Sequence, residues 1–346
     1  GFPLYQVIAE SNGGRVIEYP LLPERNWEVD TQAMDRLVTP RTRAIVVNNP
    51  SNPCGSLFSD ENLLAILAVA SKHRVPVITD EIYGSMTFSG HTFTPIAILA
   101  AKSGCGVPVL TIGGLAKMFV VPGWRVGWIL IHDPTGVLRD LRQGLLNLSQ
   151  LVLGATTLVQ AALPKVLVRR SPSKFGASGG GVEPAGASSV HPDDTELRMQ
   201  EFERTYVGAL EEAARFASKK LGTIPGLSII EPRGAMYMMV QVHPEMFEGI
   251  ADDRQFAGLL LQEEAVFVLP GTCFGAPNFF RVVFTAPEGK LAEAFDRIDA
   301  FCRSHLLEDA GTPKKKAKLT AGAASPTTSG KAASAVPSTR KFSVQP

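Results

Sequence analysis

The sequence predicts an α/β protein in which a mostly parallel sheet is flanked by helices and is followed by a smaller α+β domain. Within the first 170 residues, short apolar runs rich in Val and Ile alternate with stretches of helical periodicity, the pattern of strand, helix and parallel strand. Further along, strands and helices are mixed without that alternation. With 45% hydrophobic and 19% charged residues among 346, the composition is typical of globular proteins and excludes a fibrous or wholly disordered chain.

Four apolar runs in the first half are expected to be buried strands, at residues 43–47, 75–79, 107–112 and 126–131. Between the first two runs, Ser59 is expected to cap a helix whose first turn carries Asp60 and Glu61. In an open sheet of this kind, ligands bind beyond the carboxyl ends of the strands. The polar residues that follow these runs are therefore the candidates for chemistry.

The second half of the chain has a different organisation. A Gly-, Ser- and Pro-rich insert at 171–195 is expected to be a flexible surface excursion, and a long helix is expected from about 194 to 220. Two more helices are expected, with strands at 227–230, 235–242, 265–269 and 279–284. Beyond residue 308 the chain has too few apolar side chains to fold and is expected to be disordered. The predicted organisation is a large domain at 1–195, a small domain at 196–308 and a tail at 309–346.

Charge is unevenly distributed along the chain. The whole sequence carries a net charge of +1, but residues 310–346 hold seven basic side chains and no acid, which leaves 27 basic and 33 acidic residues elsewhere. An acidic body gives no support for nucleic-acid binding. The segment PKKKAKL at 313–319 resembles a nuclear import signal, but a solvated basic tail is the favoured interpretation.

The spacing of the cysteines and histidines gives no sign of a disulfide framework or a metal site. Four cysteines lie far apart and six histidines are scattered, so we expect neither a disulfide framework nor a metal centre. A reducing compartment fits best; we expect the cytoplasm, with the mitochondrion as an alternative. No apolar stretch reaches the roughly 18 to 20 residues of a membrane span, so no membrane association is expected.

Two polar clusters follow the first two predicted strands. In NNPSNPCG, Asn48–Gly55, two Asn–Pro pairs give a rigid turn that presents side-chain amides, and taken alone this cluster favours a structural turn. Asp80 and Glu81 follow the second strand. A carboxylate at the end of an apolar strand is costly to bury unless a cation or a donor meets it, and a capping role is an equal alternative.

Two further clusters contain cations in apolar surroundings. Lys117 follows the third predicted strand and is flanked by apolar residues, which suits the amine of a Schiff-base lysine. Eight residues later, Arg125 lies between glycines and could offer its guanidinium to a phosphate. Arg281, within NFFRVVF, either pairs with an acid or binds an anionic ligand.

Seven stretches of the chain resemble one protein family in order and spacing: GFPLYQ, NNPSNPCGS, DEIYG, GGLAK, VPGWRVGWILIHD, PGLSIIEPRGAMYMMV and NFFRVV. They are similar to the class I and II aminotransferases, which are fold-type I pyridoxal-phosphate (PLP) enzymes, and within that family to the tyrosine aminotransferase subgroup. The resemblance covers nearly all of residues 1–170 and 197–305. It implies PLP as cofactor, a homodimer, and transfer of an amino group from an aromatic L-amino acid to a 2-oxo acid such as 2-oxoglutarate.

The same resemblance implies roles for individual residues. Lys117 would bond the cofactor and carry the substrate proton, and Asp80 would pair with the pyridine nitrogen. Tyr83 and Asn52 would hydrogen-bond the phenolic oxygen, with Asn52 also near the substrate. Three further roles are implied: stacking on the ring by Phe2, binding of the phosphate by Arg125, and binding of the substrate α-carboxylate by Arg281.

The chain also departs from the family pattern. Where many members have Ser or Thr three residues before the lysine, this chain has Gly114, so that phosphate contact is missing or is made by Thr111 or by backbone. The chain is expected to be a fragment without the family's amino-terminal arm, its Gly- and Ser-containing phosphate loop and the tyrosine from the neighbouring subunit.

Three alternatives therefore stay open. The protein could be another fold-type I enzyme, such as an alanine aminotransferase or an aminocyclopropane carboxylate synthase. It could be a carbon–sulfur lyase of the same fold. It could also be a truncated, inactive relative with a binding or regulatory role.

Overall fold

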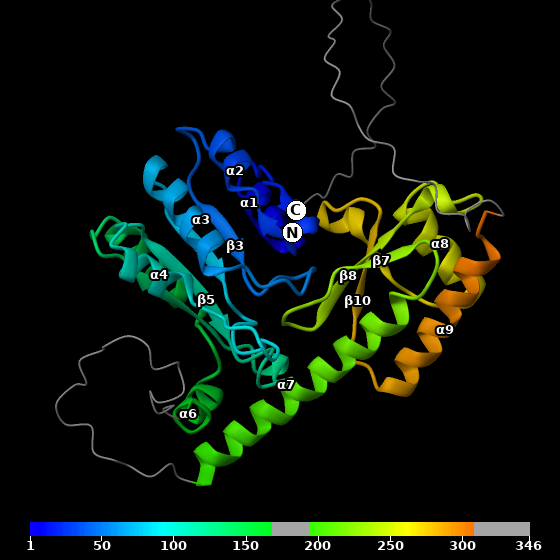
Figure 1. Cartoon of the computed structure of the whole chain (residues 1–346). Helices are drawn as coiled ribbons and strands as arrows, with labels where there is room; N and C mark the ends of the chain where they lie inside the picture. Colours follow the sequence, from blue (N-terminus) through cyan, green and yellow to red (C-terminus); the bar gives the residue numbers. More distant parts are fainter. Residues whose placement is uncertain (168–193, 308–346) are drawn as a thin grey trace, which may run out of the picture. The chain divides into compact units, whose positions relative to one another are not determined.

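The computed structural model describes residues 1–167 and 194–307, and the first of its larger sheets has four strands (Figure 1). The strands are β3 (Ile45–Asn48), β4 (Val77–Asp80), β5 (Val109–Gly114) and β6 (Gly127–His132), in that order. The first three are parallel and β6 is antiparallel to β5. The predicted mostly parallel sheet is therefore confirmed, with each strand within two residues of its expected start.

The register of this sheet brings the candidate clusters to one edge. Asn48 is paired with Asp80, and Asp80 with Ile112, so strands β3, β4 and β5 end at nearly the same level. The turn after Asn48, the carboxylate of Asp80 and the loop after Gly114 consequently leave the sheet side by side.

Helices pack on this sheet and bury its apolar side chains. Helix α3 (Asp60–His73) begins as predicted, because the hydroxyl of Ser59 accepts a hydrogen bond from the backbone of Asn62. It shares a core with α4 (Ile96–Ser103) and α2 (Thr31–Leu37), which includes the fully buried Val47, Ile66, Val77, Ile96 and Val109. Before them lie α1 (Pro3–Ser11) and the short strands β1 (Leu21–Leu22) and β2 (Glu28–Val29).

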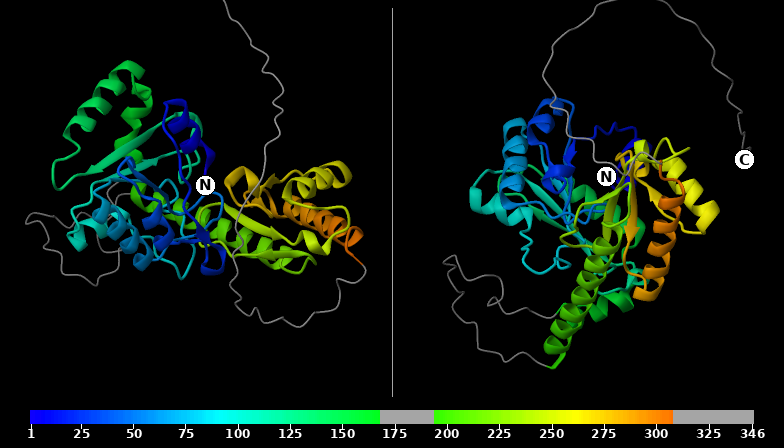
Figure 2. Two further views of the ribbon diagram at one scale, coloured as in Figure 1. Left: turned by 90° about the horizontal axis from the view of Figure 1, so that it is seen from above. Right: turned by 45° about the vertical axis from the view of Figure 1, so that its right-hand side comes forward.

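The second larger sheet is antiparallel, with the strand order β7-β8-β10-β9. Its strands are β7 (Leu227–Ile229), β8 (Tyr237–Val242), β9 (Leu269–Pro270) and β10 (Phe279–Val283). Helices α7 (Asp194–Leu221), α8 (Asp253–Glu264) and α9 (Glu288–Ser304) run along it (Figures 1 and 2). Their shared core contains Phe256, whose ring stacks on Phe280 at 5.3 Å and meets Phe301 edge-on. The predicted mixture of strands and helices in the second half is present, and the antiparallel pairing of its strands is added by the structure.

Two predicted strands differ from the structure. Residues 265–268 form no strand, because Ala265 ends α8 in the left-handed conformation and Phe267 is exposed; pairing begins at Leu269. Strand β6 forms, but it is not buried: Ile129 and Leu130 are exposed at the edge of the sheet. The following helix α5 (Arg139–Val152) also exposes apolar side chains, namely Leu141, Leu146, Leu148 and Leu151. Helix α6 (Thr157–Val166) ends the first half.

A buried turn joins the two sheets. All ten residues 49–58 are buried, although none is in a helix or strand. Pro50 and Pro53 have no N–H to satisfy, while Asn48 and Asn49 accept from the backbone nitrogens of Asn52 and Phe58 through their side chains. At its end, the carbonyl of Gly55 accepts from the nitrogens of Arg233 and Gly234, just before β8. The alternation of Asn and Pro thus lets an irregular segment be buried without unpaired backbone groups at these positions.

Replacing Gly55 by Ala tests this junction. Gly55 has φ +65°, and a Cβ there would lie 2.1 Å from the carbonyl oxygen of Tyr237 and 2.7 Å from Pro232. We expect Gly55→Ala to lower the free energy of unfolding by about 2–4 kcal/mol, from the left-handed backbone and the clash together. Urea denaturation measures it. Gly104→Ala is the matched control, because Gly104 has φ +64° with nothing within 4 Å, so equal losses in both variants would contradict the packing argument.

Parts of the predicted organisation lie outside the described residues. These parts are most of the insert, at 171–193, and the tail at 309–346, so the predictions for them stay as they are. Residues Gly1–Leu307 cluster as one compact unit, and the domain boundary near residue 195 stays a prediction. Among the described helices, none combines the length and the apolar character needed to span a bilayer.

Candidate functional site

The candidate site lies at the edge where β3, β4 and β5 end. Asn52 comes from the turn after β3, Asp80 is the last residue of β4, and Lys117 lies in the turn after β5. Arg281 comes from β10 of the second sheet. The structure therefore brings together side chains that are up to 229 positions apart in the sequence.

Arg281 is held in place by uncharged neighbours. Its Nη1 donates to Oδ1 of Asn52 at 2.9 Å, and its guanidinium lies over the rings of Tyr237 and Phe274 at 4.9 and 4.8 Å. Its Nε is buried and has no hydrogen-bond partner within the part of the chain that the structure describes. Burial lowers the pKa of this guanidinium from its ordinary value, although arginine stays charged throughout the physiological range. A buried donor on a fixed cation is a place where an anion would bind.

Tyr83 and Lys117 continue this set of contacts. The hydroxyls of Tyr83 and Tyr237 are 2.9 Å apart, and Nζ of Lys117 lies 5.8 Å from the centre of the Tyr83 ring. Burial and the neighbouring Tyr237 raise the pKa of Tyr83, so its hydroxyl stays protonated. Lys117, Tyr83, Tyr237, Arg281 and Asn52 thus form one continuous series of side chains.

Asp80 accepts hydrogen bonds on both carboxylate oxygens. The backbone nitrogen of Ile82 donates to Oδ1 at 3.1 Å, and the hydroxyl of Tyr5 donates to Oδ2 at 2.5 Å. The ring of Phe2 meets Tyr5 edge-on, with the ring centres 5.7 Å apart. Phe2 therefore reaches the site through Tyr5, and its position near Asp80 is compatible with the role the resemblance gives it.

Arg125 lies in the loop between β5 and β6. It is exposed and donates from Nη1 to the carbonyl of Pro122 at 2.9 Å, within its own loop. That loop holds two non-glycine residues in the left-handed region, Val120 at φ 55° and Arg125 at φ 53°. A β-branched residue in this region is strained, which marks the loop after Lys117 as one that its surroundings must hold.

Gly114 is closely packed at the end of β5. A Cβ at this position would lie 3.0 Å from the carbonyl oxygen of Val126 and 3.2 Å from Cδ1 of Ile82. A Ser or Thr side chain would therefore crowd the adjacent strand. Thr111 lies further back in β5, in register with Thr79.

Three residues of the site were missed by reasoning from the sequence: Tyr5, Tyr237 and Phe274. Tyr5 lies three positions after Phe2, so a helical interpretation of GFPLYQ would have placed both on one face. Phe274 belongs to PGTCFG, close to Arg281 in the sequence. Tyr237 had no signal, because in AMYMMV it is indistinguishable from a core residue.

Glu81 caps helix α4, whereas the alternative stated for the acidic pair was a cap of the turn that directly follows it, where Asp80 accepts from Ile82. Its Oε1 accepts from the first backbone nitrogen of α4, at Ile96, at 3.1 Å and from the hydroxyl of Thr79 at 3.2 Å. Burial is the main cause that raises its pKa to about 7, against the hydrogen bonds that lower it. Glu81 thereby ties the segment after Asp80 to the start of a helix.

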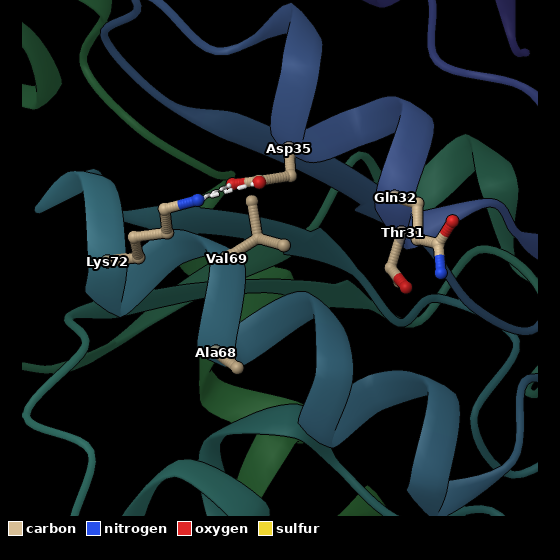
Figure 3. Close-up of a pocket in the computed structure, with 6 residues that line it drawn as sticks. All are labelled: Thr31, Gln32, Asp35, Ala68, Val69 and Lys72. Carbon is tan, nitrogen blue, oxygen red and sulfur yellow. Dashed lines mark hydrogen bonds and ion pairs between the residues drawn. The ribbon is translucent and has the colours of Figure 1, made fainter.

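An open surface depression between α2 and α3 is unrelated to these residues (Figure 3). Lys72 and Asp35 pair across it, with Nζ 2.7 Å from Oδ2. Its charged groups already satisfy one another, and none of the predicted site residues lines it.

Comparison with known proteins identifies the family. The family model described as aminotransferase class I and II matches residues 1–298, and the chain belongs to this family. It is 44% identical over 306 residues to a tyrosine aminotransferase of Bos taurus and 42% identical to one of Homo sapiens, in each case over 88% of the chain. The chain spans about three fifths of the length of these relatives: 61% and 60%.

Solved structures agree with the fold. A tyrosine aminotransferase from Leishmania infantum superposes with a TM-score of 0.76 at 32% identity, over 89% of this chain and 68% of that one. An alanine aminotransferase from Pyrococcus furiosus gives a TM-score of 0.75 at 28% identity, over 88% of this chain and 69% of that one. The predicted fold-type I α/β architecture is confirmed by these neighbours.

The elevated pKa of Glu81 predicts a pH dependence of stability. The folded state binds this proton more tightly than the unfolded state, so the free energy of unfolding should fall as pH rises from about 4.5 through about 7. Glu81→Gln keeps an acceptor for Ile96 but has no charge to bury. The free energy of unfolding of this variant should therefore decline less than that of the wild type between pH 5 and pH 8. Thermal unfolding at both pH values measures the difference.

Glu211→Gln is the control for this measurement. The Glu211 carboxylate also accepts from a backbone nitrogen and a hydroxyl, both of Ser89, but these hydrogen bonds lower its pKa. Removing the Glu211 carboxylate should leave the decline of unfolding free energy between pH 5 and pH 8 as steep as in the wild type. An unchanged pH profile in Glu81→Gln would show that the buried carboxyl is not its source.

Proposed function

We propose that the full-length protein is a PLP-dependent aminotransferase that moves an amino group from an aromatic L-amino acid to a 2-oxo acid such as 2-oxoglutarate. The observation that carries this proposal is the set of contacts joining Lys117 to Arg281 through Tyr83 and Tyr237. It connects an amine, through two tyrosines, to a cation whose Nε has no hydrogen-bond partner among the described residues. The names of the similar tyrosine aminotransferases support the choice of an aromatic substrate.

The donors and acceptors present fit PLP. The pyridine nitrogen needs a carboxylate, for which Asp80 is oriented through both oxygens. The aldehyde carbon needs an amine, Lys117, and the phenolic oxygen needs donors, which Tyr83 and Asn52 can supply. Arg125 is the candidate for the phosphate. When bound, PLP supplies an electron-accepting ring that stabilises negative charge at the substrate Cα.

Three residues of the chain would each have a separate role in the reaction. Arg281 would bind the substrate α-carboxylate with two N–H groups and so orient the Cα–H bond. Lys117 would take the proton from Cα at its Nζ and return it on the cofactor side. Asp80 would keep a proton on the ring nitrogen, since an anion next to this nitrogen favours its charged form.

The proposal includes the compartment and the oligomeric state of the protein. We place it in the cytoplasm as a homodimer, because all four cysteines are free and the apolar side chains of β6 and α5 are exposed. Light scattering on the full-length protein and cell fractionation would test the two statements. A monomer, or recovery with another compartment, would contradict them.

The lysine is the first test of this function. Full-length protein incubated with PLP should gain a cofactor absorbance band that borohydride fixes to the polypeptide at Lys117, and Lys117→Ala should lack it. Lys72→Ala is the control, because Lys72 is an exposed lysine paired with Asp35. A colourless wild-type protein would support the inactive relative instead.

The reaction products separate the remaining alternatives. Glutamate formed from tyrosine and 2-oxoglutarate supports the proposed reaction, whereas a preference for alanine indicates an alanine aminotransferase. Release of pyruvate with ammonia indicates a carbon–sulfur lyase.

Substrate binding is tested at Arg281. Arg281→Lys keeps the charge but loses the two-pronged guanidinium, so kcat/KM for tyrosine should fall by about 10- to 100-fold, equivalent to about 1.4–3 kcal/mol. Arg303→Lys, in an exposed ion pair with Asp299, should leave kcat/KM unchanged. Equal kinetics in Arg281→Lys and wild type would remove Arg281 from the substrate site.

A further inference from the structure

Tyr5 is a contact of the predicted site to which neither the motifs nor the family roles give a function. It lies on α1, is half-buried, and its hydroxyl donates to Oδ2 of Asp80 at 2.5 Å. Burial first, and then the charge of Asp80, raise the pKa of this phenol. The hydroxyl therefore keeps its proton and acts as a donor to the carboxylate.

This hydrogen bond is unusual for helix α1. No residue of α1 is fully buried, and Leu4, Val7 and Ile8 are exposed. Within the described chain, the other side-chain hydrogen bonds made from α1 and the residue after it stay within residues 6–12. A loosely packed helix thus places one polar group against the sheet, and that group meets Asp80.

The two donors to Asp80 differ in kind. Oδ1 is bound by the backbone nitrogen of Ile82, which any residue would supply, whereas Oδ2 is bound by the side chain of Tyr5. A carboxylate oxygen has more than one acceptor site, so the Tyr5 bond leaves room on Oδ2 for a second donor. After burial, the charge of Asp80 also contributes to the raised pKa of Glu81 and of Tyr83, which lie in the segment after β4.

We propose that Tyr5 is a positioning residue for Asp80: its hydroxyl fixes the carboxylate in the orientation that holds a proton on the ring nitrogen of PLP. The proposal rests on the proposed function. It assigns Tyr5 an effect on the cofactor's charge, and not solely a role in fastening α1 to the sheet.

Tyr5→Phe removes the hydroxyl and keeps the ring that packs on Phe2. With the carboxylate less well oriented, we expect PLP to bind about tenfold more weakly, the effect of one charge-assisted hydrogen bond. The ring nitrogen would also hold its proton less firmly and draw less charge from the nitrogen that Lys117 contributes. The pH midpoint of the bound cofactor's absorbance should therefore rise, by about 0.5–1 pH unit.

Tyr19→Phe is the matched control. The hydroxyl of Tyr19 donates to the backbone carbonyl of Val46 in β3 at 2.6 Å, so this variant also loses a short tyrosine hydrogen bond to the same sheet. We expect both variants to lose similar unfolding free energy in urea, while only Tyr5→Phe changes the PLP dissociation constant and the absorbance midpoint. Unchanged cofactor binding and midpoint in Tyr5→Phe would overturn the proposal and leave Tyr5 with a structural role.

A double-mutant cycle with Asp80→Asn gives a second, independent measurement. If Tyr5 acts through the carboxylate, Tyr5→Phe should weaken PLP binding clearly less in the Asp80→Asn background than in the wild type. Additive effects would contradict the proposal even if both single variants bind PLP weakly. A wild-type protein that binds no PLP would instead refute the proposed function, so the two failures are distinguishable.

Discussion

The buried turn at residues 49–58 is the constraint on which the rest of the site depends. A ten-residue irregular segment can be excluded from water when its backbone groups find partners, and here asparagine side chains supply acceptors where prolines remove donors. The close approach of Gly55 to Tyr237 then sets how near the second sheet comes to the first. Asn52, in the middle of the turn, meets Arg281 across that junction.

Some hydrogen-bond donors at this junction have no partner within the described residues. Asp80 is oriented by Tyr5 and Ile82, and the hydroxyls of Tyr83 and Tyr237 form one hydrogen bond, which leaves the proton of one of them free to be donated. Arg281 has an amide and two aromatic faces as neighbours; among the described residues no carboxylate pairs with it and its Nε has no hydrogen-bond partner. In a partly dehydrated site, a cation with an unpaired N–H donor favours the binding of an anionic ligand.

Much of the first sheet could be predicted because its strands are short Val- and Ile-rich runs followed by distinctive polar residues. The burial of β6 could not, since an apolar strand reads the same in the middle of a sheet and at its edge, where Ile129 and Leu130 are exposed. Residues 265–268 were apolar enough for a strand, but the left-handed Ala265 turns the chain first. An apolar pattern shows that a segment can be buried, but it does not show whether another part of the protein covers it.

For the candidate site, residue types with rare chemistry were easier to find than their partners. Lys117, Asp80 and Arg281 stand out in apolar surroundings, and the contacts bring Lys117 and Arg281 into one series. Tyr5 and Tyr237 do not stand out, because a tyrosine fits a helix surface or a core equally well. Their importance comes from hydrogen bonds to residues 75 and 154 positions away, which no local pattern contains.

These separations also bear on the order of events during folding. The contacts between Tyr5 and Asp80, Tyr83 and Tyr237, and Asn52 and Arg281 each close a long loop of chain. Closing such loops costs entropy before any of these bonds can form, whereas the strand pairs within each sheet lie closer in sequence. The two sheets can therefore assemble early and the constellation between them late. The candidate site would accordingly be among the last parts of the molecule to form.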